Sequence, residues 1–273
     1  MIAETGRACR YGIIGFGQIG QRLARRLSGG RDAPHLIGVL ANPDRRPQAE
    51  SILGPDRVFD DLGTLLKHRP DVVVECASAA ALAEHGVTIL SAGSDLLPLS
   101  LAAFADRDVE ARLIAAAERG PGRLEIPAGA MASIGLLAAA REDTLSSVIF
   151  RAAYPPMRWR GTPAEQLIAL EGLDAQATFL STSVREAVAL FPRHINVSVG
   201  VALAGLGLDG TKAELIADPG LTQARFELAV KAGPGRIDLV VAGRDAGLGE
   251  DPVDYTTFSL MRLLRRRQAR VMI

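Results

Sequence analysis

The sequence predicts an α/β protein, with a doubly wound parallel sheet of the Rossmann type followed by a second α/β (α+β) domain. Residues 10 to 127 alternate short apolar runs with helical patterns, as βαβ units do. A Gly-x-Gly-x-x-Gly run follows the first apolar run, and the alternation stops after Pro127. We therefore expect a dinucleotide-binding domain over 1–127 and a substrate domain over 128–250. A C-terminal helix over 251–273 could pack back on the first domain.

The first strand and helix enclose the glycine run. Residues 11–14 form a short apolar strand, and Ile19, Leu23 and Leu27 repeat at helical spacing. The first glycine of such a run makes a tight turn, the second lets a pyrophosphate approach, and the third lets helix and strand pack closely. The alternative is a structural turn that binds no phosphate. The residues predicted to bind the cofactor here are Gly15, Phe16, Gly17, Gln18, Ile19 and Gly20.

The second strand, over residues 35–40, bears on the choice of cofactor. An NAD site usually has an acidic residue at the end of this strand, where it holds the ribose hydroxyls. The chain has Asn42 there, followed by Arg45 and Arg46. Arginine can bind a 2′-phosphate, so the cofactor is NADP or NAD, with NADP favoured. The alternative is that both arginines are solvated loop charges.

Later strands of the first domain supply further predicted cofactor contacts. Residues 71–78 form a buried strand that turns into a helix, and residues 86–93 form another strand that ends in glycine. A helix rich in alanine extends to residue 118, and a last strand covers 123–127. Because strand ends face the cofactor crevice, the predicted contacts are Cys76, Ala77, Ser78, Gly93, Ser94 and, where the second domain begins, Ala128.

The second domain has a different pattern. A helical segment over 128–140 and an alternating strand over 146–153 lead into a loop, and Thr162-Pro-Ala-Glu165 is a capping box. Helices follow over 184–190 and 196–205, then strands over 212–217, 225–231 and 236–242, and a terminal helix over 256–267. Three neighbouring strands imply a sheet.

Composition excludes several classes of function. Lysine plus arginine and aspartate plus glutamate both number 31, which argues against a nucleic-acid or membrane-surface binder. The two cysteines, Cys9 and Cys76, give neither a disulfide framework nor metal-ligand spacing. Neither a membrane span nor a signal peptide is evident. We expect a cytoplasmic protein with a small-molecule substrate and no metal.

Several motifs together resemble the L-aspartate dehydrogenase family nearly from end to end. They are the glycine run, residues 74–78, 92–96, 126–130, 155–162, 191–197 and 217–219. The resemblance implies an NAD(P)-dependent oxidoreductase that acts on CH–NH₂ donors and converts L-aspartate to iminoaspartate, and so to oxaloacetate plus ammonia. It also implies a role in pyridine nucleotide biosynthesis, and a homodimer or higher homo-oligomer with its contact in the second domain.

The chain departs from this family at reactive positions. Alignment on residues 217–219 puts Phe226 where the family has its catalytic histidine, and Ala224 where it has an asparagine. Phenylalanine cannot carry a proton. An acidic residue that the family has near the start of the second domain is missing from residues 129–135, and the family's Asn-Pro-Lys-Thr-Ser segment is divergent at 251–257.

Other residues are candidates for the missing roles. His194 is the candidate acid/base, and the alternative is a histidine that only starts a helix. Arg158 and Arg160 are candidates for binding substrate carboxylates, with Asn196 as a further polar contact. Three hypotheses remain: an aspartate dehydrogenase, an imine or carbonyl reductase with a remodelled pocket, and a dinucleotide-binding protein without turnover.

Overall fold

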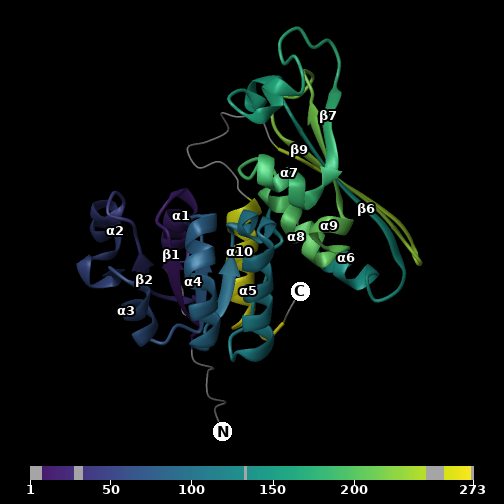
Figure 1. Cartoon of the computed structure of the whole chain (residues 1–273). Helices are drawn as coiled ribbons and strands as arrows, with labels where there is room; N and C mark the ends of the chain where they lie inside the picture. Colours follow the sequence, from purple (N-terminus) through teal and green to yellow (C-terminus); the bar gives the residue numbers. More distant parts are fainter. Residues whose placement is uncertain (1–7, 28–32, 132–133, 244–254, 272–273) are drawn as a thin grey trace. The chain divides into compact units, whose positions relative to one another are not determined.

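The computed structural model describes residues 8–27, 33–131, 134–243 and 255–271. The chain divides into two compact units. Unit 1 comprises Met1–Gly129 and Thr256–Ile273, and unit 2 comprises Ala130–Tyr255 (Figure 1). The C-terminal segment therefore belongs with the N-terminal unit, although the whole of unit 2 separates them in sequence.

Unit 1 contains a five-stranded parallel sheet in the order β3-β2-β1-β4-β5. Its strands are β1 (Arg10–Ile14), β2 (His35–Leu40), β3 (Val58–Phe59), β4 (Val72–Glu75) and β5 (Asp95–Pro98). The strand order reverses between β1 and β4, as it does in doubly wound folds. The predicted Rossmann-type sheet is confirmed.

Helices cover both faces of this sheet. They are α1 (Gln18–Arg26), α2 (Arg46–Leu53), α3 (Leu62–Lys67), α4 (Ala79–Ser91), α5 (Arg107–Arg119) and α10 (Tyr255–Arg266). On one face, Leu23 of α1 and Leu264 of α10 share a core with Tyr11 of β1. On the other face, Leu65 of α3 packs where a side chain of Gly12 would lie. The terminal helix thus completes the core of unit 1.

Residues 86–93 are not the strand that the sequence predicted. They belong to α4, and the strand is β5, which follows them. Leu82, Gly86, Ile89 and Leu90 are the buried residues of α4, a spacing typical of one helix face. Gly86 lets α4 approach α5, because a Cβ there would lie 2.4 Å from Leu113 Cδ2. The predicted strand over 123–127 is reduced to one isolated bridge, between Leu96 and Leu124.

Unit 2 contains a mixed five-stranded sheet in the order β10-β9-β6-β8-β7. Only the β6–β8 pair is parallel. The strands are β6 (Leu145–Tyr154), β7 (Ala177–Ser183), β8 (Lys212–Ala217), β9 (Arg225–Ala232) and β10 (Gly235–Ala242), and the helices are α6 (Ile134–Ala140), α7 (Val184–Leu190), α8 (Asn196–Ala204) and α9 (Gly207–Gly210). The sequence did not predict β7.

The two faces of the unit 2 sheet differ in character. Helices α6 to α9 gather on one side of it (Figure 1). The core residues Phe150 and Leu228 are paired across β6 and β9 and are buried. The next residue of β6, Arg151, points to the opposite face and binds Glu214 at 2.6 Å and Glu227 at 3.9 Å. One face is thus an apolar core, while the other carries a ladder of ion pairs.

Within the described parts of the chain, no helix is long and apolar enough to cross a membrane.

Candidate functional site

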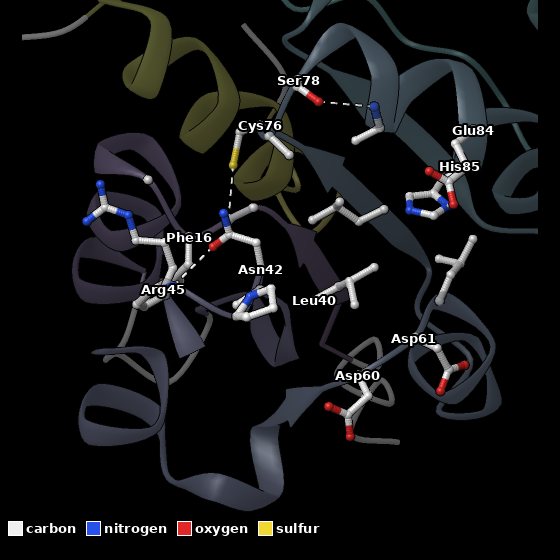
Figure 2. Close-up of a pocket in the computed structure, with 18 residues that line it drawn as sticks. Phe16, Leu40, Asn42, Arg45, Asp60, Asp61, Cys76, Ser78, Glu84 and His85 are labelled. Carbon is white, nitrogen blue, oxygen red and sulfur yellow. Dashed lines mark hydrogen bonds and ion pairs between the residues drawn. The ribbon is translucent and has the colours of Figure 1, made fainter. Parts of the chain in front are cut away.

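A cavity of about 630 Å³ lies in unit 1 at the carboxyl ends of β1, β2 and β4. Figure 2 shows side chains converging on it from the turn after β1, the loops after β2 and β3, and helix α4. It is lined by Ile14, Gly15, Phe16, Gly17, Leu40, Ala41, Asn42, Pro43, Arg45, Asp60, Asp61, Leu62, Cys76, Ala77, Ser78, Ala81, Glu84 and His85. This is the position at which doubly wound sheets bind nucleotides.

The glycine run has the geometry that a dinucleotide requires. Gly15 has φ +95°, and a Cβ there would lie 2.8 Å from the Ala77 backbone. A Cβ on Gly20 would lie 2.5 Å from the Gly15 oxygen, whereas a Cβ on Gly17 would meet no atom within 4 Å. Two glycines therefore permit close packing, and the third leaves open space beside the backbone. The run fits a pyrophosphate.

The start of helix α1 offers donors to such an anion. Gly17 is the N-cap residue and supplies no side chain to cap the first turn, which also contains no acidic residue. The backbone N–H groups at this end and the positive end of the helix dipole favour a phosphate.

The cavity brings together only part of the predicted cofactor contacts. Gly15, Phe16, Gly17, Asn42, Arg45, Cys76, Ala77 and Ser78 line it. Gln18, Ile19 and Gly20 form the first turn of α1 and do not line it. Arg46 and Ala128 do not line it either. Sequence reasoning missed Asp60, Asp61, Glu84 and His85, since no motif marks the loop after β3 or the middle of α4.

Gly93 and Ser94 were predicted in the wrong place. They follow α4 and precede β5, so they lie at the edge where the strands begin, opposite the cavity. The Ser94 hydroxyl donates a 2.7 Å hydrogen bond to the Pro70 oxygen, just before β4. The error follows from the mistaken strand over 86–93, which reversed the direction assigned to this segment.

The two arginines after β2 have different environments. Arg46 binds Glu50 at 2.7 Å and also binds Asp60, so two carboxylates neutralise it. Arg45 is exposed and lines the cavity, and its guanidinium makes one long contact, 3.5 Å, with Gln48 Oε1. Arg45 is therefore the better placed of the two to meet a phosphate in the cavity.

The other polar groups of the cavity are mostly engaged by the protein. Asp61 caps α3 by accepting hydrogen bonds from the Thr64 N–H and hydroxyl, both at 2.8 Å, and these bonds lower the pKa of Asp61. Burial raises the pKa of the Cys76 thiol, which lies 3.5 Å from the Gly15 oxygen. Cys76 thus lines the cavity as a neutral thiol and is not a reactive thiolate.

In unit 2, a group of rings surrounds Tyr154, the last residue of β6. We call Tyr154, Trp159, His194 and Phe226 the Tyr154 cluster. The ring centroids of Trp159, His194 and Phe226 lie 5.1, 5.6 and 5.9 Å from that of Tyr154, each with edge-to-face geometry. Burial raises the pKa of Tyr154 to about 12, so its hydroxyl stays protonated at neutral pH.

His194 is fixed in this cluster by three contacts. Its ring stacks on Trp159 at 4.9 Å, and its backbone oxygen accepts a 2.7 Å hydrogen bond from the Tyr154 hydroxyl. Its Nε2 lies 2.9 Å from the Arg158 oxygen. A carbonyl oxygen only accepts, so Nε2 carries the proton. In the neutral ring, Nδ1 then has the lone pair.

Phe226 lies on β9, opposite Ala152 of β6, and is half-buried. Its ring also stacks on Phe150 at 5.8 Å. The Phe226 ring thus extends the apolar core, and both this ring and the His194 ring lie against Tyr154.

The two candidate arginines of the tryptophan loop also differ. Arg160 binds Glu171 at 2.7 Å. Arg158 is exposed, and its charge lowers the pKa of Tyr154, against the larger effect of burial. Asn196, the first residue of α8, is half-buried. The predicted departures at residues 132–133 and 251–254 lie outside the described residues.

The described residues contain no group of three or more His, Cys, Asp or Glu that could hold a metal ion.

Comparison with known proteins gives a consistent result along the chain. A family model described as aspartate dehydrogenase, C-terminal, matches residues 135–267, and one described as homoserine dehydrogenase, NAD binding domain, matches residues 15–127. An L-aspartate dehydrogenase of Ruegeria pomeroyi is 36% identical over 97% of this chain and 95% of that protein. One of Ralstonia nicotianae is 36% identical over 96% of this chain and 98% of that protein.

The fold agrees with a solved structure. The crystal structure of an aspartate dehydrogenase from Thermotoga maritima has a TM-score of 0.75 and 22% identity, and the match covers 98% of this chain and all of that one. The parallel sheet, the glycine run and sequence similarity over nearly the whole chain together lead to one conclusion: this chain belongs to the L-aspartate dehydrogenase family of NAD(P)-dependent oxidoreductases.

Proposed function

We propose that this protein oxidises the Cα–N bond of L-aspartate with NADP as the preferred hydride acceptor, giving iminoaspartate, which water converts to oxaloacetate and ammonia. The observation that supports this most is similarity to L-aspartate dehydrogenases over 97% of the chain, combined with a cavity whose glycine turn fits a pyrophosphate. The bound nicotinamide would supply the oxidising equivalent. The chain's own residues would bind, orient and move protons.

Cofactor binding would begin at the turn after β1. The N–H groups at the start of α1 would hold the pyrophosphate, and the open space at Gly17 would admit it. Asn42 and Arg45 would face the adenosine ribose, with the Arg45 guanidinium on a 2′-phosphate. Arg46 is neutralised by Glu50 and Asp60, so we assign the preference for NADP to Arg45 alone.

The NADP preference can be measured by comparing dissociation constants of NADPH and NADH. An exposed charge pair contributes about 0.2 to 1 kcal/mol. The Arg45→Ala variant should therefore bind NADPH about 1.4- to fivefold more weakly, with NADH binding unchanged as the internal control. Equal losses for both dinucleotides would remove Arg45 from the assignment.

In unit 2 we assign the proton transfers to His194. The bond from Nε2 to the Arg158 oxygen leaves Nδ1 as the basic nitrogen, and stacking on Trp159 holds the ring in one orientation. Nδ1 would take a proton from the substrate ammonium group before hydride transfer and release it to solvent. It would then take a proton from the water that attacks the imine and return it to the nitrogen that leaves as ammonia. Phe226 can do neither, and the Tyr154 hydroxyl stays protonated at neutral pH, so His194 is the ring of the cluster that we assign to this role.

Arg158 is our candidate for a substrate carboxylate. A guanidinium fork matches the two carboxylate oxygens, and the side chain of Arg160 is already paired with Glu171. Asn196 would add a hydrogen bond to the substrate or to the nicotinamide amide. We also propose a homodimer, which the family resemblance implies; light scattering after size-exclusion chromatography would measure the molecular mass.

A steady-state assay tests the proposed reaction directly. L-Aspartate with NADP or NAD, and oxaloacetate plus ammonia with NADPH or NADH, should each show a change in absorbance at the nicotinamide band. Turnover of neither pair, by protein that binds the dinucleotide, would eliminate L-aspartate as substrate.

Phe226 favours a second candidate. Its ring, packed on Phe150 and Tyr154, makes this position apolar, so the pocket could accept a larger or less acidic imine or carbonyl compound. Reduction of such compounds, but not of oxaloacetate plus ammonia, would support this reading, and activity on aspartate alone would exclude it. Tight dinucleotide binding without turnover of any amine, imine or carbonyl compound would instead indicate a binding protein.

A further inference from the structure

The last residue of β4 is a fully buried carboxylate. Glu75 has no exposed surface, yet its side chain accepts four hydrogen bonds. Its Oε1 accepts from the Ala77 N–H at 2.8 Å, the Ser78 N–H at 3.0 Å and the Ser100 hydroxyl at 2.8 Å, and its Oε2 accepts from the Ser100 N–H at 3.1 Å.

A carboxylate is a costly choice at this position. The preceding residues of β4 are three buried valines, and an ionised group loses its hydration when it is buried among such neighbours. Burial accordingly raises the pKa of Glu75, although the four hydrogen bonds oppose the shift. The residue is tolerated because both of its buried oxygens accept hydrogen bonds. Its structural effect therefore depends on which segments of the chain supply the donors.

The donors come from two different loops. Ala77 and Ser78 follow β4, while Ser100 follows β5. The backbone of Glu75 adds a further bond, since its oxygen accepts from the Leu99 N–H at 2.8 Å. Glu75 therefore ties together the loops at the carboxyl ends of two neighbouring strands.

These loops lie beyond the point where the strand order reverses. In doubly wound folds the two halves of a dinucleotide bind on either side of this point. The adenosine side has its own supports in the glycine turn and in the loops after β2 and β3. The loops after β4 and β5 belong to the nicotinamide side. Cys76 to Ser78 are the residues of these loops that line the cavity.

We propose that Glu75 is a positioning residue that sets the place of the nicotinamide half of the cofactor by clamping the loop after β4 to the loop after β5. It acts through the Ser78 and Ser100 segments and not by touching the cofactor. The inference rests on the proposed dinucleotide function. It predicts that a change at Glu75 weakens binding of the nicotinamide half of the ligand more than binding of the adenosine half.

The test compares whole dinucleotides with fragments that carry only the adenosine half. In Glu75→Gln the amide NH₂ would face an N–H donor, so at least one hydrogen bond is lost. We expect the dissociation constants of NADPH and NADH to rise about tenfold. Those of 2′,5′-ADP and ADP should rise about twofold at most, because Ala77 also borders the Gly15 turn. Isothermal titration calorimetry measures both without requiring turnover.

Two further variants complete the design. Ser100→Ala removes one of the four bonds and keeps the carboxylate, so it should weaken dinucleotide binding about threefold and leave the fragments unchanged; it decides the question if Glu75→Gln does not fold. Asp95→Asn is the matched control, since Asp95 is a buried carboxylate at the opposite edge of the same sheet. Neither class of ligand should respond to it.

The outcomes separate the two proposals. Suppose that the unmodified protein binds dinucleotides. If folded Glu75→Gln and Ser100→Ala then bind them equally tightly, or lose affinity for dinucleotides and fragments by the same factor, the proposed role of Glu75 is wrong. The proposed function is not affected by that result. If the unmodified protein binds neither dinucleotides nor fragments, both proposals are wrong.

Discussion

The glycine turn of unit 1 and the Tyr154 cluster of unit 2 differ in the groups that would contact a ligand, which are backbone groups at the turn and side chains in the cluster. At the turn, the proposed contacts come from backbone N–H groups and from space that Gly17 leaves open. In and beside the cluster, they come from the side chains of His194 and Arg158, while Phe226 places an apolar ring against Tyr154. A backbone site persists as long as its glycines do. A side-chain site changes its chemistry with one substitution and keeps its fold.

The largest expected effect tests the side-chain site. His194→Gln removes the proposed base and should lower kcat by about 10²- to 10⁴-fold, with dinucleotide affinity unchanged. Stopped-flow or steady-state measurement of NADPH formation gives the kcat of the variant. His68→Gln is the matched control, because His68 also lies against an aromatic ring, Phe59 at 5.0 Å, but belongs to unit 1. A kcat within threefold of the unmodified enzyme for His194→Gln would exclude His194 as the base.

The next effect tests the backbone site. Gly17→Ala places a methyl group where the pyrophosphate would lie, and overpacking of this kind costs about 1 to 3 kcal/mol, a loss of about 5- to 150-fold in dinucleotide affinity. The free energy of unfolding should change by less than about 0.5 kcal/mol, because the Cβ meets no protein atom within 4 Å.

Gly135→Ala is the control for that variant, since its Cβ also meets no atom within 4 Å. It should leave dinucleotide affinity unchanged, although alanine in helix α6 is expected to raise the free energy of unfolding by about 0.5 to 1 kcal/mol. Unchanged dinucleotide binding by Gly17→Ala would contradict the assignment of the turn to a phosphate.

A smaller effect would sharpen the comparison. Phe226→His in the His194→Gln background places a proton carrier at another position beside Tyr154, and we expect it to recover about tenfold of the lost kcat. Phe226→Leu in the same background should recover none. Equal behaviour of the two variants would mean that position 226 does not border the reacting atoms.

The smallest effect concerns charge in unit 1. Burial alone would raise the pKa of Asp95, but hydrogen bonds from Arg123 and Arg267 hold this pKa below its usual range. A carboxyl with a lowered folded pKa stabilises the protein above its unfolded pKa of about 3.9, and the contribution is lost as the pH falls through the folded value. Urea unfolding of Asp95→Asn should thus show reduced stability at pH 5 and a shrinking difference from the unmodified protein towards pH 2.

Sequence reasoning succeeded where a single local signal decides the structure. The glycine run fixed β1 and α1, and the periods of residues 184–190 and 212–217 match α7 and β8 as observed. It failed for residues 86–93, where Val87, Thr88 and Ile89 are β-branched and glycines stand at both ends, features typical of a strand. Packing of α4 against α5 overrides this preference for a strand, and packing between two separate segments cannot be predicted from the local sequence of either one.

The site was predicted less completely than the fold, for the same physical reason. Spacing could not distinguish Arg45 from Arg46 or Arg158 from Arg160, because their partners Asp60 and Glu171 are set by tertiary structure. The hydrogen bonds of Glu75 could not be predicted, since nothing local shows that Ser100 folds back to it. The polar sequence of β7 likewise gave no strand signal.

The return of α10 to unit 1 has a consequence for the order of events on the ribosome. Leu260 and Leu264 belong to the core that covers one face of the first sheet, yet Ala130–Tyr255 is translated before them. At about 5 to 20 residues per second, that face waits roughly 6 to 25 s for its last helix. During this interval the part of the core around Tyr11 and Leu23 that α10 covers is not yet shielded from water, although the glycine turn has already emerged.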